Sequence, residues 1–292
     1  MPALRTPSIS FVNLKGGVGK TALAVNVAFA LAEWYGRSVL LVDIDPQFNA
    51  TQHLLDESII VKGLKGKTIK DILDPPPPTM PVGTGKKKKK KAPRPSPRRF
   101  LREIEVADGS LHLLPSLLDL SFVNRNPQAQ HGRLEKYLHE IEDDFDIILI
   151  DCPPTISILT MAAFNASRYY VIPVTPDYFA PIGIPLMEEE VEYFLGNLHA
   201  DTAEMQPLGI VFTIVDQRWH ANWEDVANRV KGATEIEVFD THFSHSKRWR
   251  DCAPKHRPVY EEERSGTQRR QLEQFMEEFM ERLETAESER AE

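Results

Sequence analysis

The feature that most limits the fold of this chain is a glycine-rich segment, NLKGGVGKT at 13–21, placed between two strongly patterned segments. The segment before it, 9–13, is short, apolar and rich in strand-forming residues. The segment after it, 20–35, consists of strong helix formers and is followed by Gly36. A strand, a glycine-rich loop and a helix in this order are typical of a phosphate-binding loop, although Leu14 stands where the usual pattern has a glycine.

Each residue type in this loop suits the binding of a phosphate chain. Gly16, Gly17 and Gly19 let backbone N–H groups turn toward a phosphate, because no Cβ lies in the way. The helix that begins near Lys20 adds the positive end of its dipole. Lys20 is expected to reach the β- and γ-phosphates of a nucleotide, and Thr21 is expected to place its hydroxyl on Mg²⁺.

Apolar strands alternate with helices along most of the chain. Continuous apolar runs, which suit strands buried on both faces of a sheet, are found at 38–45, 111–114, 146–150, 169–174 and 208–215. Helical patterns are found at 133–141, 160–165, 184–198, 221–230 and 267–283. This alternation predicts an α/β fold with a single doubly wound, mostly parallel sheet and helices on both faces.

Three carboxylates follow the ends of these apolar runs. Asp43 and Asp45 end the run at 38–45, and Asp151 follows the run at 146–150. Open α/β sheets bind ligands at the carboxyl ends of their strands, where a phosphoryl-transfer site needs acids for metal and water. We therefore expect the three side chains to lie at one edge of the sheet, beside the glycine loop.

The positive charge of the chain is concentrated in one segment. The net charge is −8, yet residues 74–99 hold nine Lys and Arg against one Asp. This segment opens with four prolines, contains six consecutive lysines and has few apolar residues to bury, so it is predicted to be a flexible insertion within a single domain spanning 1–292. It suits either a solubilising loop or a nonspecific tether for polyanions.

Composition also narrows the cellular compartment. The N-terminus lacks the charged and then apolar regions of an export signal, and the most apolar helical stretch, 22–34, is too short to span a bilayer. Two cysteines cannot form a disulfide framework. These features predict a cytoplasmic protein.

Three motifs together resemble those of the ParA/MinD family of ATPases. KGGVGKT at 15–21, VDIDPQFNAT at 42–51 and DIILIDCPPT at 146–155 are similar, in order and spacing, to the deviant Walker A, switch I and Walker B/switch II motifs of that family. Segments at 171–177, 209–218 and 257–268 also resemble it, so the similarity runs through most of the chain. The resemblance implies a P-loop NTPase of the deviant Walker A type that hydrolyses ATP with Mg²⁺.

The resemblance also implies roles for single residues. Lys15 matches the signature lysine that crosses the interface of an ATP-bound homodimer to the partner's nucleotide, and Asp45 matches the switch I acid needed for hydrolysis. The implied metal-binding residues are Thr21, Asp43 and Asp151. The implied nucleotide contacts are Lys15, Gly16, Gly17, Val18, Gly19, Lys20, Thr21, Ala22 and, against the base, Pro258 and Val259. Lys15, Lys20 and Asp45 would carry catalysis.

Two positions depart from the family pattern. Phe48 replaces the usual glycine of DPQGNAT, and Ala22 replaces a common second threonine. Phe48 is expected to alter the motion of switch I and therefore the rate of hydrolysis more than the binding of ATP.

A ParA-like role would make this chain a nucleotide switch on the nucleoid. The ATP dimer would bind double-stranded DNA nonspecifically, and a cargo-bound partner protein, ParB-like or analogous, would stimulate hydrolysis. The best candidates for DNA contacts are Lys247, Arg248 and Arg250, interleaved with Trp249, and weaker candidates are Arg218, Arg229 and Lys231.

Other roles within the same superfamily need features that this sequence lacks. Membrane cycling of the MinD type needs a basic amphipathic C-terminal helix, whereas the tail of this chain is acidic, so no membrane partner is expected. A metabolic or metal-insertion enzyme needs a substrate pocket or metal ligands, and the nine histidines form no tight cluster, although His242 and His245 are three residues apart. Cys152 and Cys252 lack the spacing of cluster ligands and are read as structural thiols. A tyrosine kinase of the superfamily needs a tyrosine-rich tail, which this sequence lacks.

Overall fold

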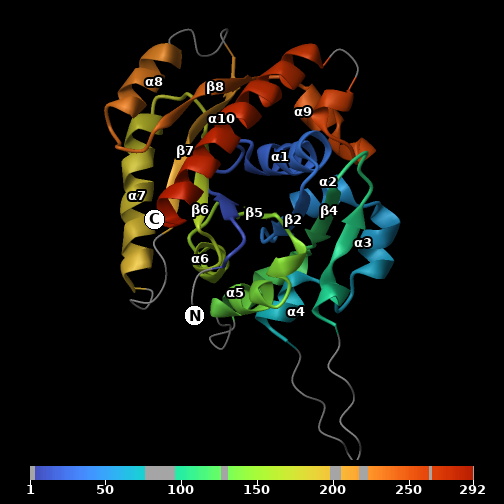
Figure 1. Ribbon diagram of the computed structural model, residues 1–292. Coiled ribbons are helices and arrows are strands. Elements are labelled where there is room, and N and C mark those ends of the chain that lie inside the picture. The colour runs from blue at the N-terminus through green and yellow to red at the C-terminus, as the bar shows by residue number, and fades with distance from the viewer. Residues whose placement is uncertain are drawn as a thin grey trace, which may run out of the picture.

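The computed structural model describes residues 4–75, 96–125, 131–197, 205–216, 223–262 and 265–291. One eight-stranded sheet runs through this part of the chain in the order β3-β4-β2-β5-β1-β6-β7-β8 (Figure 1). Neighbouring strands pair in parallel except β3 and β4, which are antiparallel. The predicted α/β class with a mostly parallel sheet is confirmed.

Most of the strands lie where the apolar runs predicted them. The strands are β1 (Ser8–Phe11), β2 (Ser38–Asp43), β3 (Arg102–Ile104), β4 (Ser110–Leu114), β5 (Ile147–Asp151), β6 (Tyr169–Val174), β7 (Gln206–Val215) and β8 (Val238–Ser244). Two strands were not predicted, β3 and β8, and they form the two edges of the sheet. Only one residue of β3 and two of β8 are buried, so neither strand has the continuous apolar run that marks a central strand.

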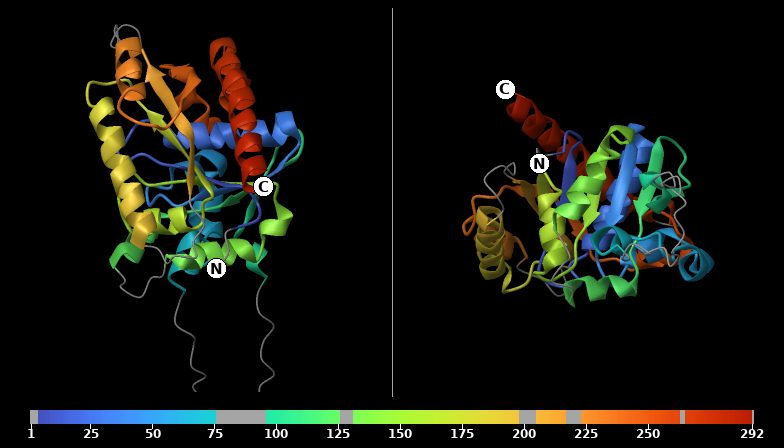
Figure 2. Two further views of the ribbon diagram at one scale, coloured as in Figure 1. Left: turned by 60° about the vertical axis from the view of Figure 1, so that its left-hand side comes forward. Right: turned by 90° about the horizontal axis from the view of Figure 1, so that it is seen from below.

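Helices lie on both faces of the sheet (Figure 2). They are α1 (Lys20–Tyr35), α2 (Asn49–Leu54), α3 (Glu57–Gly63), α4 (Ile69–Leu73), α5 (Gly132–His139), α6 (Ile158–Asn165), α7 (Ala180–Asn197), α8 (Trp223–Lys231), α9 (Arg248–Asp251) and α10 (Gly266–Ala291). Alternate residues of the central strands enter two different apolar clusters. In β2, Leu41 belongs to the cluster that includes residues of α1 and α10, whereas Leu40 belongs to the cluster that includes residues of α4 to α8. Both faces of the sheet are therefore core.

The last helix, α10, is longer than predicted. Its apolar face is buried against the sheet, at Leu272, Phe275, Met276, Phe279 and Leu283, so it is the packing helix that the sequence predicted. Its last two turns have no such face. They are held instead by polar contacts of Glu287, which accepts a hydrogen bond from the Tyr169 hydroxyl at 2.6 Å and pairs with Arg168 at 2.8 Å. No helix in the described ranges is apolar enough over sufficient length to cross a membrane.

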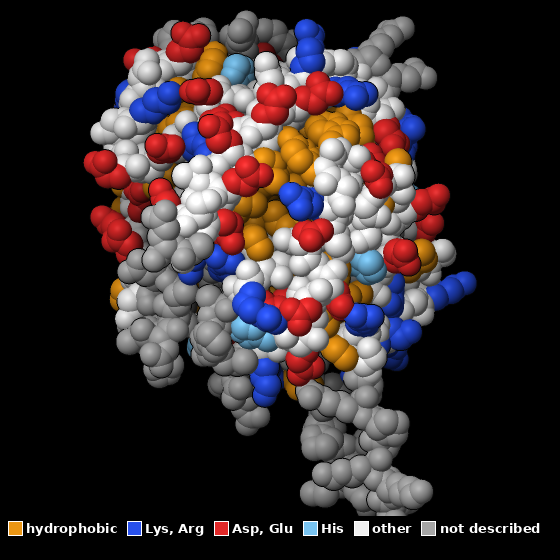
Figure 3. Space-filling model, viewed as in Figure 1, with side chains coloured by type: hydrophobic (Ala, Val, Ile, Leu, Met, Phe, Trp, Pro, Cys, Tyr) orange, Lys and Arg blue, Asp and Glu red, His pale blue; other side chains and the backbone are white. Residues whose placement is uncertain are grey.

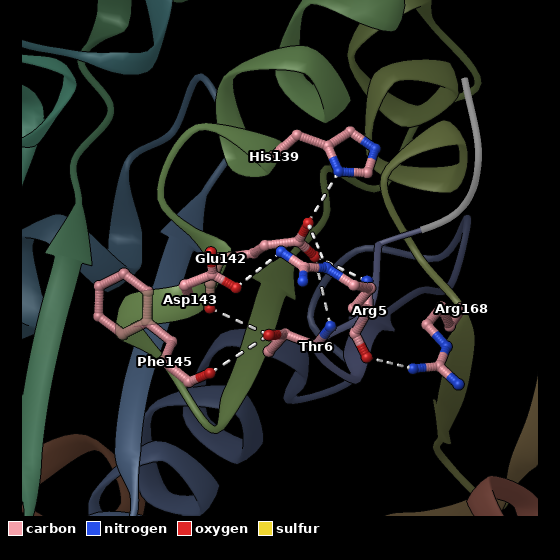
Figure 4. Close-up of polar contacts among 7 residues, drawn as sticks. All are labelled: Arg5, Thr6, His139, Glu142, Asp143, Phe145 and Arg168. Atoms are coloured by element: carbon pink, nitrogen blue, oxygen red, sulfur yellow. Dashed lines mark hydrogen bonds and ion pairs between the residues drawn. The ribbon is translucent and has the colours of Figure 1, made fainter.

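A polar network anchors the segment that leads into β1 (Figure 4). The buried Glu142 carboxylate accepts hydrogen bonds from the backbone N–H of Arg5 at 2.7 Å and from His139 Nδ1 at 2.9 Å. Burial alone would raise the pKa of Glu142, but the hydrogen bonds that the carboxylate accepts outweigh this effect and hold the pKa below its usual value. Thr6 Oγ1 donates to the Glu142 carbonyl at 3.0 Å, and the Arg168 guanidinium donates to the Arg5 carbonyl at 2.7 Å. The network fixes the N-terminal end of β1, and the glycine loop follows the other end of this strand.

The predicted flexible insertion lies mostly outside the described residues, which resume at Ser96. The last residues of the predicted range belong to the fold. Ser96 Oγ accepts a hydrogen bond from the Arg98 N–H at 3.3 Å and caps a 3₁₀ turn over Pro97–Phe100. The Arg98 guanidinium pairs with the Asp144 carboxylate. The chain therefore re-enters the fold before the predicted boundary at residue 99.

Candidate nucleotide-binding site

The glycine loop joins β1 to α1 and is positioned by two neighbouring strands. Asn13 Nδ2 donates to the Pro173 carbonyl of β6 at 2.8 Å, and Asn13 Oδ1 accepts from the Lys15 N–H at 2.8 Å. On the other side, Thr213 Oγ1 of β7 donates to the Val18 carbonyl at 2.6 Å. The carboxyl ends of β6 and β7 thus determine the shape of the loop.

Two glycines of the loop have backbone conformations that favour glycine. Gly17 and Gly19 have φ values of 77° and 84°, in the left-handed region. A Cβ added at Gly16 or Gly17 would meet no atom within 4 Å, so the loop is open to a ligand at these positions. This open, glycine-lined turn at the start of a sixteen-residue helix is suited to a phosphate chain.

Lys20 holds the centre of the loop. Its Nζ donates to the carbonyls of Asn13 at 2.9 Å and Lys15 at 3.2 Å, and the residue is only 6% exposed to solvent. Burial lowers the pKa of Lys20, while the charges of Asp151 and Asp45 act in the opposite direction. The predicted phosphate lysine therefore lies between the loop and the carboxylates.

Thr21 and Asp151, both predicted metal residues, are in direct contact. Thr21 Oγ1 donates to Asp151 Oδ2 at 2.7 Å. The second carboxylate oxygen, Asp151 Oδ1, is buried and has no hydrogen-bond partner among the described residues. Burial and the neighbouring Asp43 raise the pKa of Asp151 well above its usual range. A buried carboxylate oxygen without a partner, next to a threonine hydroxyl, fits the preference of Mg²⁺ for oxygen ligands.

Asp43 lies opposite Asp151 on the adjacent strand, but both of its oxygens have other partners. Oδ2 accepts from the N–H and the hydroxyl of Thr51, each at 2.8 Å, and Oδ1 accepts from the Asp45 N–H at 3.2 Å. Burial raises the pKa of Asp43 to about 7. In this structure Asp43 holds the segment that includes Thr51, whereas Asp151 has one oxygen with no partner among the described residues.

Asp45 lies just after β2 and is 5% exposed. Its Oδ1 accepts from the Gln47 N–H at 2.8 Å, and its backbone carbonyl accepts from Ser116 Oγ at 2.9 Å. Burial raises the pKa of Asp45, while the Gln47 hydrogen bond and the Lys20 charge act in the opposite direction. The structure thus brings the predicted hydrolytic acid, the loop lysine and Asp151 together, as the motif order implied.

Lys15 differs from Lys20 in both exposure and direction. Its side chain is 57% exposed, and its Nζ pairs with Asp177, three residues before α7 begins at Ala180. Asp177 also accepts from the Thr175 hydroxyl at 2.7 Å, and the Lys15 and Thr175 hydrogen bonds hold its pKa below the usual range despite partial burial. Lys15 therefore lies at the surface beside its own loop. Asp177 was not among the predicted site residues, although it ends the segment 171–177 that resembles the family.

The predicted base contacts lie along α1. The Val259 N–H donates to Asn26 Oδ1 at 2.7 Å, and Asn26 Nδ2 donates to the Ala22 carbonyl at 2.7 Å. The Val259 side chain is fully buried, and Pro258 is also buried. Asn26 thus connects this segment to the helix that follows the glycine loop, and the contact with a base remains a prediction.

The basic cluster lies at and beside α9. Lys247 and Arg250 are exposed, whereas Arg248 is half-buried. Trp249 is not free to interleave with them, because its ring packs against Phe243 with centroids 5.3 Å apart. Of the weaker candidates, Lys231 is exposed, Arg229 lies over the Tyr178 ring and Arg218 lies outside the described residues.

A groove on another side of the molecule is unsuited to a phosphate ligand. It lies between the end of α1 and α10, has a volume of about 640 Å³, and its lining includes Tyr35, Met280, Glu277, Glu281 and Glu284. Figure 3 shows acidic side chains beside apolar ones along α10 on this face. Phosphates would be repelled by these glutamates, so the glycine loop remains the candidate site.

The thiols and the histidines supply no second metal centre in the described part of the chain. Cys152 and Cys252 are free and buried, and burial raises the pKa of the Cys252 thiol to about 11. Within the described ranges, no three His, Cys, Asp or Glu side chains are arranged to hold a metal ion. A cation at Asp151 would therefore need further ligands from phosphate or water, as is usual for Mg²⁺ in nucleotide sites.

Phe48, which replaces the family glycine, has a left-handed backbone with φ of 45° and ψ of 39°. This conformation costs a residue with a side chain about 1–2 kcal/mol relative to glycine. We therefore expect Phe48→Gly to be at least about 1 kcal/mol more stable than Phe48→Ala, although alanine is normally the better helix former. Urea unfolding of the two variants measures the difference, because both lack the ring. Equal stability, or a more stable alanine variant, would contradict the strain at this position.

Comparisons with known proteins agree with the geometry. A family profile described as an AAA domain matches residues 6–202. The chain is 30% identical over 266 residues to the sporulation initiation inhibitor protein Soj of Bacillus subtilis, covering 86% of this chain and 89% of that protein. It is 32% identical over 238 residues to the chromosome-partitioning ATPase Soj of Treponema pallidum, covering 80% of this chain and 81% of that protein.

A solved structure supports the fold. The ATP complex of a variant of McdA from Cyanothece superposes with a TM-score of 0.70 at 18% identity, covering 95% of this chain and 96% of that one. The motifs at 15–21, 42–51 and 146–155 lie at the carboxyl ends of β1, β2 and β5 in the mostly parallel sheet. Together with the sequence relatives, these findings show that the chain belongs to the ParA/MinD family of ATPases.

Proposed function

We propose that this chain is a Mg²⁺-dependent ATPase that forms a homodimer in its ATP state, binds DNA nonspecifically in that state, and positions a DNA or protein cargo. A cargo-bound partner protein, ParB-like or analogous, would stimulate hydrolysis and release. The observation that carries the nucleotide site is the buried, unpartnered Asp151 Oδ1 beside Thr21 and Lys20. The names of the partitioning relatives support the role in cargo positioning.

The residues of the site have separable tasks in this reaction. The backbone N–H groups of the glycine loop bind the phosphate chain, and Lys20 exchanges its two carbonyl partners for phosphate oxygens. Thr21 and Asp151 would hold Mg²⁺, which when bound neutralises charge on the phosphate oxygens. Asp45, held at the end of β2 near Lys20, orients the attacking water. Its raised pKa reflects burial, which a hydrogen bond from that water would relieve.

DNA binding is expected to depend on the nucleotide and on salt. Random-sequence duplex DNA should bind with ATP and Mg²⁺ but not with ADP or without nucleotide, and binding should weaken as salt rises, because phosphate contacts release counterions. The double variant Lys247→Glu/Arg250→Glu should bind about 10-fold more weakly or worse, because each lost phosphate contact removes part of the electrostatic attraction. Fluorescence anisotropy in the three nucleotide states, at two salt concentrations, measures this.

The control for that variant is Lys62→Glu/Lys65→Glu, which changes the same charge at exposed residues of α3 and the turn after it. It should leave DNA binding within about twofold, because it changes the same net charge outside the proposed contact, where exposed charges act only through a screened field. Equal DNA binding in all three nucleotide states would reject the ATP switch and would instead assign DNA binding to the lysine-rich segment at 86–91. Equal losses in both double variants would reject the basic cluster as the DNA-binding surface.

A further inference from the structure

A chain of buried hydrogen bonds lies behind Asp45 and connects three elements. Ser116, which follows β4, donates from Oγ to the Asp45 carbonyl at 2.9 Å and from its N–H to Thr51 Oγ1 at 2.9 Å. Thr51, on α2, donates from the same hydroxyl to Asp43 Oδ2 at 2.8 Å. Thr51, Ser116 and Asp43 have no exposed surface, so water does not substitute for any of these bonds.

These hydrogen bonds fix the backbone of Asp45 on both sides. The Asp45 N–H donates to Asp43 Oδ1 at 3.2 Å, and the Asp45 carbonyl accepts from Ser116 Oγ. The Phe48 N–H also donates to that carbonyl, at 2.9 Å, but it belongs to the same turn and has a strained backbone. Ser116 therefore connects the turn to the adjacent strand β4, which pairs with β2 up to Val42.

The position of the Asp45 carboxylate follows from that of its backbone. Its Oδ1 accepts from the Gln47 N–H, which lies in the same turn and moves with it. A turn that loses its bond to Ser116 keeps its internal hydrogen bonds but is less firmly held against the glycine loop. A displacement of about 1 Å at a catalytic group is enough to slow a reaction on the order of 100-fold.

We propose that Ser116 is a positioning residue for ATP hydrolysis, with Thr51 as its partner, and that the pair holds Asp45 where it can orient water. This role rests on the proposed ATPase function. Neither hydroxyl has a hydrogen bond to the glycine loop. Ser116 holds Asp45 directly, and Thr51 holds it through Ser116 and through Asp43, whose Oδ1 accepts from the Asp45 N–H. Loss of either hydroxyl should lower kcat and leave the affinity for ATP unchanged.

The kinetic test uses the full-length protein with ATP and Mg²⁺. Ser116→Ala and Thr51→Val should each lower kcat about 10-fold and change the Kd for ATP by less than about twofold, because only transition-state positioning is lost. Thr51→Ser keeps the hydroxyl and should retain kcat within about twofold of wild type. The matched control is Ser10→Ala on β1, which removes another fully buried hydroxyl. The Ser10 hydroxyl is hydrogen-bonded to Ser167 Oγ at 2.6 Å. Ser10→Ala should not alter kcat.

A second readout does not depend on activity. Hydrogen exchange of peptides covering 43–54 should be faster in Ser116→Ala than in wild type and unchanged in Ser10→Ala, because the hydrogen bond that holds the turn is gone. Unchanged exchange over 43–54, or equal losses of kcat in Ser116→Ala and Ser10→Ala, would overturn the positioning role. A wild-type protein that binds ATP without hydrolysing it would instead refute the ATPase function, and hydrogen exchange would still decide whether Ser116 holds the turn.

Discussion

Lys20→Ala should lower the affinity for ATP with Mg²⁺ by at least about 100-fold, since it removes the ammonium group that would bond the phosphate oxygens, and losing one partner of a buried, hydrogen-bonded charge pair costs roughly 2–5 kcal/mol of binding. Lys20 is a buried cation near Asp151 and Asp45, and burial raises the pKa of both acids. Without the ammonium group, a triphosphate would approach these carboxylates with no compensating charge from the loop side chain. Isothermal titration with ATP and Mg²⁺ measures the loss.

The control for this experiment is Lys65→Ala, which deletes the same side chain at an exposed position. It should bind ATP as wild type does, because exposed lysines contribute little to a distant site. Circular dichroism of both variants separates a loss of binding from a loss of folding. Tight ATP binding by folded Lys20→Ala would reject the phosphate-binding role of the loop.

The parts of the fold that the sequence predicted well are those with local signals. The structure places α1 at Lys20–Tyr35, as predicted, because left-handed glycines, Gly19 and Gly36, flank both of its ends. The start of α4 also has a local sequence signal, because Thr68 and Asp71 form a reciprocal capping box, but this helix was not predicted. The edge strands β3 and β8 have no such signal, because their burial depends on which elements happen to cover them.

The candidate site divides in the same way. The loop residues and Asp151 could be predicted because each lies in a short motif whose chemistry is local. The roles of Ser116, Asp177 and Asn26 could not, because they depend on contacts between segments 71, 162 and 233 residues apart. Ser116 is an ordinary serine in the sequence, and only the packing of β4 against β2 brings its hydroxyl to the Asp45 carbonyl.

Lys15→Ala should abolish ATP-dependent dimerisation while leaving ATP binding by the monomer within a few-fold of wild type. The reason lies in the direction of the side chain. Lys15 Nζ does not enter its own site but pairs with Asp177 at the surface, so a second copy is where its charge can meet a triphosphate. Light scattering with ATP and Mg²⁺ measures the mass, and titration under dilute conditions measures binding.

Asp177→Asn tests the same idea from the other side of the ion pair. It removes the charge that holds Lys15 in the monomer, and an exposed pair of this kind contributes about 1 kcal/mol or less, so its loss should favour the dimer by up to a few-fold. Both variants act on one ammonium group and should shift the monomer–dimer equilibrium in opposite directions. A normal ATP dimer of Lys15→Ala would exclude the crossing role. If Asp177→Asn weakened the dimer instead, Asp177 would itself be part of the interface, and the pair with Lys15 would not compete with dimerisation.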